Sequence, residues 1–249
     1  IYGVSPYKSP TDMGVNMAGS CIVDDDVCRE ASCQEIIRRY YDSLGRMVRE
    51  ECGQEEVYKI ELLMKQANIS PEMRSVVKPC KDLASSIQAP AAAMELEDGT
   101  IVTGKTSNLL GASAALLLNA VKVLGNIPHD THLIAPSAIE PIQKLKTTYL
   151  GSKNPRLHTD EVLIALSMCA ATDRNAQIAL EQLPKLRGCQ VHTSVMLSSV
   201  DITTFKKLGL QLTSEPIYEH KRIYNYFRMK MPPQPTVNQR NEKNPITPD

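Results

Sequence analysis

The sequence lacks an excess of charge of either sign, because Lys plus Arg and Asp plus Glu are both 28 and the formal net charge is zero. It also lacks a run of basic residues with interleaved aromatics. Nucleic acids and anionic membrane surfaces attract clustered lysines and arginines, so both absences argue against these partners. We therefore expect neither a nucleic acid nor a membrane among the partners of this protein.

No apolar run is long enough to cross a bilayer. The longest one, residues 109 to 123, is interrupted by small polar residues and is shorter than the ~20 residues that a membrane-spanning helix needs. No signal peptide precedes it, so we expect a cytoplasmic protein. The 249 residues, 42% of them hydrophobic, suit a folded globular protein. The first residue is Ile rather than Met, which indicates part of a longer polypeptide.

The cysteines form no Cys-x-x-Cys pair and stand at no zinc-finger spacing from a histidine. Their number is odd, which together with these spacings favours free thiols in a reducing compartment over disulfides. The sequence thus predicts no metal site. The seven residues are Cys21, Cys28, Cys33, Cys52, Cys80, Cys169 and Cys189.

Composition and periodicity divide the chain into four parts. Residues 1 to 23 combine prolines and glycines in a polar setting, which predicts an extended arm. In residues 24 to 88, apolar side chains recur every three or four positions, which predicts a helical subdomain. Residues 89 to 216 alternate strands and helices and predict an α/β domain. The proline-rich residues 217 to 249 are expected to form a C-terminal extension and tail.

Within these parts, individual elements follow from periodicity, caps and turn residues. The sequence predicts helices over residues 24 to 52, 55 to 67, from 70 onward, 107 to 124, 139 to 149, 159 to 171, 173 to 186 and 201 to 209. It predicts strands over residues 92 to 97, 100 to 103, 131 to 135, 189 to 197 and 210 to 214.

Two incompatible structures fit residues 99 to 106. The spacing Gly99-x-x-x-x-Gly104-Lys105-Thr106 satisfies the pattern of a phosphate-binding loop. In such a loop backbone amides and Lys105 surround the phosphates and Thr106 binds Mg²⁺. The protein would then be a P-loop NTPase, with ATP or another nucleotide and Mg²⁺ as its cofactor.

The second structure is a β-hairpin that turns at Asp98-Gly99, a dipeptide typical of tight turns between strands. Its second strand, residues 100 to 103, would lead directly into a helix. All four of these residues are β-branched and therefore stiff, which favours a strand over a loop that wraps a ligand. The sequence alone leaves both structures open.

The hairpin, the small-residue helix after it and the following Ala135-Pro136 resemble the cytidine deaminase fold. The resemblance implies a three-layer α/β/α domain whose zinc ligands and general-acid Glu lie at the starts of two helices. In this chain those positions hold a glycine, two hydroxyls and a single carboxylate, which cannot hold zinc. They are Gly111, Ser113, Ser137 and Glu140. The resemblance thus implies a deaminase-like fold without deaminase chemistry.

Five segments carry a second resemblance, which covers nearly the whole chain: residues 5 to 16, 111 to 115, 136 to 142, 154 to 163 and 181 to 186. They are similar to the C-terminal half of a bacterial family of uncharacterised proteins, some of which are labelled ATP-dependent peptidase. The resemblance implies that the N-terminal half of the same polypeptide is a partner. Peptidase activity gains no support, because the chain has neither a His-Glu-x-x-His motif nor a nucleophile elbow.

Polar segments expected at the C-terminal edge of the sheet, where open α/β proteins bind ligands, supply the candidate site. Between two predicted helices, the guanidinium of Arg156 and the imidazole of His158 are suited to bind an anion near a helix start. We therefore predict that a phosphorylated small molecule or nucleotide binds here, without identifying catalytic residues. The predicted ligand-binding residues are Lys105, Thr106, Ser107, Asn108, Arg156, His158, His192 and Ser194. In the competing hypothesis these residues only cap helices, and the helices and tail form the assembly surface of a homo-oligomer.

Overall fold

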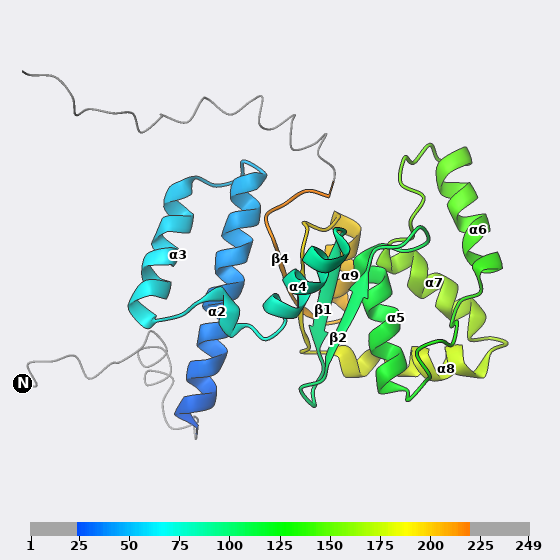
Figure 1. Ribbon diagram of the computed structural model, residues 1–249, viewed down its shortest axis with the longest axis horizontal. Coiled ribbons are helices and arrows are strands. Elements are labelled where there is room, and N and C mark those ends of the chain that lie inside the picture. The colour runs from blue at the N-terminus through cyan, green and yellow to red at the C-terminus, as the bar shows by residue number, and fades with distance from the viewer. Residues whose placement is uncertain (1–23, 220–249) are drawn as a thin grey trace, which may run out of the picture. The chain divides into compact units, whose positions relative to one another are not determined.

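The computed structural model describes residues 24 to 219 (Figure 1). The predicted arm, residues 1 to 23, and the predicted tail beyond residue 219 lie outside the described residues. The described chain up to Ile217 belongs to one compact unit, and Tyr218 and Glu219 belong to a second. Within residues 24 to 219, no helix is both long enough and apolar enough to cross a membrane.

The described part of the chain begins with two helices, α2 (Asp25–Val48) and α3 (Gln54–Ala67), which pack against each other. The side chain of Asp24 caps α2 by accepting hydrogen bonds from the backbone N–H groups of Asp26 and Val27. Apolar side chains at helical spacing form a shared core, as the sequence predicts. Its buried members are Ile36, Ile37, Tyr41, Met64, Ile69 and Val77.

Four short strands form one mixed sheet in the order β2-β1-β3-β4. Strand β1 is antiparallel to both of its neighbours, and β3 and β4 are parallel. The register pairs Ala91 with Lys105, Ala92 with Thr193, and Thr193 with Ser214. These residues therefore lie in a row across the ends of the strands, at the sheet edge where β2, β3 and β4 end. The strands are β1 (Ala91–Glu95), β2 (Ile101–Lys105), β3 (Gln190–Thr193) and β4 (Gln211–Ser214).

The hairpin is present, and the phosphate-loop prediction is wrong. The carboxylate of Asp98 accepts a hydrogen bond of 2.9 Å from the backbone of Thr100, and Gly99 adopts a φ of 82°, which favours glycine. Residues Ile101–Lys105 are paired with β1. Their backbone groups therefore belong to the sheet and cannot wrap a phosphate or present Thr106 to Mg²⁺ as a P-loop NTPase requires.

Helices cover both faces of the sheet. Ala92, Met94 and Val102 belong to the main core with α5 (Ala112–Leu124). Ala93, on the alternate face, packs with Val76 and Cys80, beside α4 (Val77–Ile87). Helix α4 packs directly on the strands and also contributes Val77 to the core of α2 and α3, so it connects the predicted helical subdomain to the sheet.

The remaining elements follow α5 and return to the sheet. They are α6 (Pro136–Lys144), the π-helical turn η2 (Leu145–Tyr149), α7 (Thr159–Cys169), α8 (Arg174–Glu181), the 3₁₀ turn η3 (Leu183–Leu186) and α9 (Ser199–Lys207). A further 3₁₀ turn, η1 (Pro71–Met73), precedes α4.

Several predicted elements have different bounds in the structure, and one is absent. Residues 131 to 135 form no strand, although Leu133 and Ile134 are buried. Strand β3 ends at Thr193 rather than at 197, because its partner β1 begins at Ala91. Helix α5 begins after Gly111 rather than at 107.

A fully buried arginine joins α2 to the sheet. Arg74 donates to Gln190 Oε1 (2.9 Å), Thr213 Oγ1 (3.1 Å), Val191 O (3.3 Å), Gln34 Oε1 (3.5 Å) and Gln211 O. All five acceptors are uncharged, and burial lowers the pKa of Arg74 to about 10. Hydrogen bonds rather than an ion pair thus hold this cation inside the protein.

Candidate functional site

Three helix N-termini lie near the sheet edge that carries Lys105 and Thr193. A parallel bridge between Leu110 and Leu157 ties the segment before α5 to the segment before α7, through Leu157 N to Leu109 O (2.9 Å) and Gly111 N to Leu157 O (3.3 Å). Helices α7 and α9 are also in contact. Residues 107 to 110 and 156 to 158, which are distant in sequence, are therefore neighbours.

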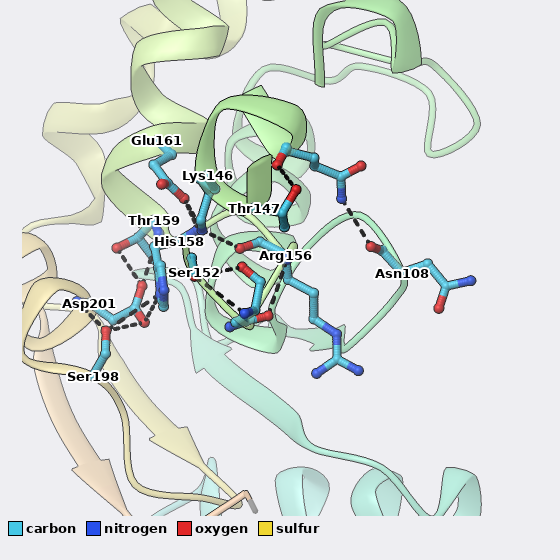
Figure 2. A network of polar contacts seen from close by, with 12 residues as sticks. Asn108, Lys146, Thr147, Ser152, Arg156, His158, Thr159, Glu161, Ser198 and Asp201 are labelled. Atoms are coloured by element: carbon cyan, nitrogen blue, oxygen red, sulfur yellow. Dashed lines mark hydrogen bonds and ion pairs between the residues drawn. The ribbon is translucent and has the colours of Figure 1, made fainter. Parts of the chain in front are cut away.

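His158 and Asp201 form the centre of this region (Figure 2). His158 Nδ1 lies 3.0 Å from Asp201 Oδ2, and the other carboxylate oxygen accepts from the backbone N–H and the hydroxyl of Thr159, both at 2.9 Å. Ser198, the N-cap of α9, donates its hydroxyl to Asp201 Oδ2 at 2.8 Å. The Asp201 carboxylate therefore fastens the start of α7 to the start of α9.

The charge state of the pair follows from these contacts. Burial acts to raise the pKa of Asp201, but the hydrogen bonds from His158, Thr159 and Ser198 outweigh it and leave that pKa lowered. The hydrogen bond to Asp201 raises the pKa of His158 by more than burial lowers it. The carboxylate thus stays ionised and favours the imidazolium.

A second ion pair fixes the loop before α7. Lys146, on the turn η2, is buried and donates to Glu161 Oε2 (2.7 Å) and to the carbonyl oxygen of Arg156 (2.6 Å). Glu161 Oε2 also accepts from the backbone N–H of His158 at 2.7 Å, which caps α7. Lys146 and Glu161 consequently fix the backbone of Arg156 and His158, respectively (Figure 2).

The arrangement suits proton exchange or anion binding by His158. Its side chain is 31% exposed, and among residues 24 to 219 its Nε2 atom has no hydrogen-bond partner. Ser198 does not act as a nucleophile paired with this base, because its hydroxyl lies on the Nδ1 side of the ring, at 3.5 Å, and donates to Asp201. A serine-hydrolase triad is therefore not formed.

Most of the other predicted ligand residues are near the bridge, and several have structural partners. Thr106 N donates to Pro90 O, the hydroxyl of Ser107 accepts from Leu109 N and Leu110 N, and the carbonyl of Asn108 accepts from Gln143 Nε2. Lys105, at the end of β2, is exposed. In Figure 2 the Arg156 side chain extends away from the His158–Asp201 pair.

His192 is not part of this group. It is fully buried, with Nδ1 at 2.8 Å from Thr213 Oγ1, Nε2 at 3.3 Å from Glu215 Oε1, and its ring against that of Tyr41. Burial lowers the pKa of His192 despite the neighbouring Glu215 carboxylate. The hydroxyl of Ser194 accepts from Ala91 N at 2.9 Å and so extends the pairing of β1 and β3.

Sequence reasoning placed His158 in the site but missed its partners. The sequence predicts Asp201 as a helix cap or, with the phosphate loop, as the aspartate that follows an apolar strand, whereas Ser198 is the cap and Asp201 bonds to a histidine 43 residues away. No local pattern signals such a long-range pair, and the same holds for the contact between Lys146 and Glu161.

Metal ligands are not gathered in the described part of the chain. No group of three or more His, Cys, Asp or Glu side chains within residues 24 to 219 is placed to hold a metal ion. The six cysteines in that range are free thiols.

The contact with Asp201 predicts a pH dependence for His158. The substitution Asp201→Asn is expected to lower the pKa of His158, measured by NMR titration of the imidazole. Since the folded-state pKa is raised, the His158–Asp201 contact stabilises the fold fully below the unfolded pKa of about 6.5 and is lost as pH rises through the folded value. The difference in unfolding free energy between wild type and Asp201→Asn should therefore shrink as pH rises.

Asp173→Asn is the matched control, because Asp173 also accepts a hydrogen bond at a helix start but has no histidine partner among residues 24 to 219. Its effect on stability should not change over the same pH range. An unchanged His158 pKa in Asp201→Asn would show that the contact is electrostatically unimportant.

Comparison with known proteins gives two family matches. The model for the domain of unknown function DUF1846, C-terminal, matches residues 72–224, and the model for DUF1846, N-terminal, matches residues 1–68. A UPF0371 protein of Corynebacterium efficiens is 56% identical over 222 residues, which cover 89% of this chain and 45% of that protein. A UPF0371 protein of Streptococcus uberis is 47% identical over 224 residues, or 90% of this chain and 45% of the relative. The chain thus spans about half the length of these curated relatives.

Proposed function

The chain belongs to the DUF1846 family, and we propose that its α/β part binds a phosphorylated small molecule or nucleotide beside His158. The observation that supports this proposal most is the His158–Asp201 contact, which fixes the ring and leaves Nε2 without a partner among residues 24 to 219. An imidazolium held in this way donates a charge-assisted hydrogen bond to an anion. The nearby start of α7 adds the positive end of a helix dipole.

Lys105 is the second cation of the proposed site. It ends β2 at the same sheet edge and is exposed, so its ammonium can approach a bound phosphate. Thr106, Ser107 and Asn108 connect it to the Leu110–Leu157 bridge and thereby to the segment that carries His158. The ligand would lie between residues 105 to 108 and residue 158, with His192 excluded by its burial.

We further propose that the α/β part is related to the deaminase fold without its metal. The strand order β2-β1-β3-β4 with an antiparallel hairpin, and the helix α5 that follows it, support this relation. The start of α5, where a deaminase holds zinc, here presents Gly111 and the buried Ser113, while Ser137 and Glu140 are exposed on α6. These residues do not form a zinc site, so the proposed function is binding rather than hydrolytic deamination.

Thermal unfolding with inorganic phosphate, ATP and GTP tests the site. At least one of these probes should stabilise the wild type, by about 2.7 kcal/mol when its concentration is a hundred times its dissociation constant. Lys105→Ala and His158→Gln should each reduce that stabilisation, because each removes a cation from the ligand. The effect should also weaken as pH rises through the raised pKa of His158, since the imidazolium loses its charge.

Lys65→Ala is the control, because Lys65 is an exposed lysine on α3, outside the proposed site. It should leave the stabilisation by phosphate probes unchanged. The proposal is wrong if none of the three probes stabilises the wild type, or if Lys105→Ala and His158→Gln respond to them as Lys65→Ala does.

A further inference from the structure

A cleft lies along the outer edge of β4, on a different part of the protein from His158. Its volume is about 360 Å³. One wall consists of Arg38 and Tyr41 on α2 and of Arg49, which caps the C-terminus of that helix, and the other wall contains Ile202 and Lys206 on α9. Both helices contact β4, and Figure 1 shows where these three elements lie in the fold. The floor is formed by β4 itself, from Gln211 to Ser214.

The strand at the bottom of this cleft has one unpaired edge. Strand β4 is last in the sheet order, and within residues 24 to 219 no strand pairs with its outer side. The backbone N–H groups of Gln211 and Glu215 point to β3, where they donate to Cys189 O and Thr193 O. Because backbone groups alternate along a strand, those of Leu212 and Ser214 point outward into the cleft. Such an edge is a template for another strand.

The side chains around this edge combine apolar surface with positive charge. Met196, Leu197, Ile202 and Leu212 supply the apolar part, and Ile202 is 38% exposed. The charged residues of the cleft are three cations, Arg38, Arg49 and Lys206, and one carboxylate, Asp42. Arg38 and Arg49 are paired with Glu35 (2.6 Å) and Glu51 (2.8 Å), whereas Lys206 has no ionic partner among the described residues.

We propose that this cleft binds an extended peptide segment rich in acidic and apolar residues, which adds to β4 as a further strand. Main-chain hydrogen bonds to Leu212 and Ser214 would hold the segment, and its side chains would meet Arg38 and Arg49 on one wall and Ile202 and Lys206 on the other. A small anion needs only donors, whereas this edge offers outward donors and acceptors at strand spacing. The site therefore matches the chemistry of a peptide backbone.

Selection from a phage-displayed library of random peptides on the full chain tests this proposal. Enriched peptides should be rich in acidic and apolar residues. Their affinity should fall roughly tenfold or more in Lys206→Glu, because a like charge then faces the acidic side chains. Lys207→Glu is the matched control: it makes the same change one residue later on α9, outside the cleft, and should bind like the wild type.

Hydrogen exchange measured by NMR then identifies the mode of binding. A bound peptide should slow the exchange of the Leu212 and Ser214 amides at least severalfold, whereas the Gln211 amide, which is already paired, should change little. The proposal is overturned if no peptide is enriched, if enriched peptides bind Lys206→Glu and Lys207→Glu equally, or if binding leaves the Leu212 and Ser214 amides unprotected.

Discussion

Replacing Arg74 by alanine is expected to destabilise the protein by about 4 kcal/mol or to prevent folding. The substitution leaves the acceptors on Gln34, Gln190 and Thr213, and two backbone carbonyls, without their donor inside the protein. It also opens a cavity, since the arginine side chain is fully buried. Urea unfolding followed by circular dichroism measures the loss.

Two further variants show whether hydrogen bonds are the cause. Arg74→Met fills much of the volume but donates no hydrogen bond, so it should still cost more than about 2 kcal/mol. Arg39→Ala, which removes an arginine whose side chain is 72% exposed in a surface ion pair, should change stability by less than about 0.5 kcal/mol. A loss below about 1 kcal/mol in Arg74→Ala would contradict the structure of this network.

The second large loss of stability is expected in Gly104→Ala, and its cause is the packing of the folded protein rather than ligand binding. A Cβ atom on Gly104 would lie 2.3 Å from Leu116 N, 2.6 Å from Leu116 Cα and 2.7 Å from Ala112 O. These are backbone atoms of α5, which cannot turn away as a side chain can. Gly104→Ala should therefore destabilise the protein by about 3 kcal/mol or more, measured by thermal and chemical unfolding.

Gly53→Ala is the control for Gly104→Ala, because a Cβ atom at Gly53 meets nothing within 4 Å and the residue has a φ of −86°. Its effect should stay within about 1 kcal/mol. If residues 99 to 106 instead wrapped a phosphate, Gly104→Ala would weaken nucleotide binding and leave the unliganded protein about as stable as the wild type. Such a result would contradict the hairpin.

The sequence predicted those parts of the fold that depend on local chemistry. The two N-terminal helices and the mixed α/β character follow from periodicity, and the Asp98-Gly99 turn is one of the two structures that the sequence leaves open for residues 99 to 106. The apolar residues 131 to 134 were misassigned because a short buried run has the same pattern with or without a partner strand. Ser107 was misassigned as a helix cap because its hydroxyl closes a local turn with Leu109 and Leu110 instead.

The candidate site was predictable only in part. Lys105 and His158 stand out because polar residues follow a strand or precede a helix; Lys105 ends β2, and His158 is the N-cap of α7, next to the Leu110–Leu157 bridge. Because side chains alternate along a strand, the sequence shows that His192 and Val191 of β3 lie on opposite faces of the sheet. It does not show that α2 covers the face on which His192 lies, where Tyr41 contacts its ring. Asp201 and Arg74 depend on contacts between distant segments, which only the folded chain reveals.

The two family models meet between residues 68 and 72, yet Arg74 binds Gln34 and the ring of His192 contacts that of Tyr41. Cutting the chain where the models meet would break the hydrogen bond from Arg74 to Gln34 and the ring contact of Tyr41 with His192, and would remove the α2 wall of the cleft along β4. We therefore expect each piece alone to be less stable than the intact chain.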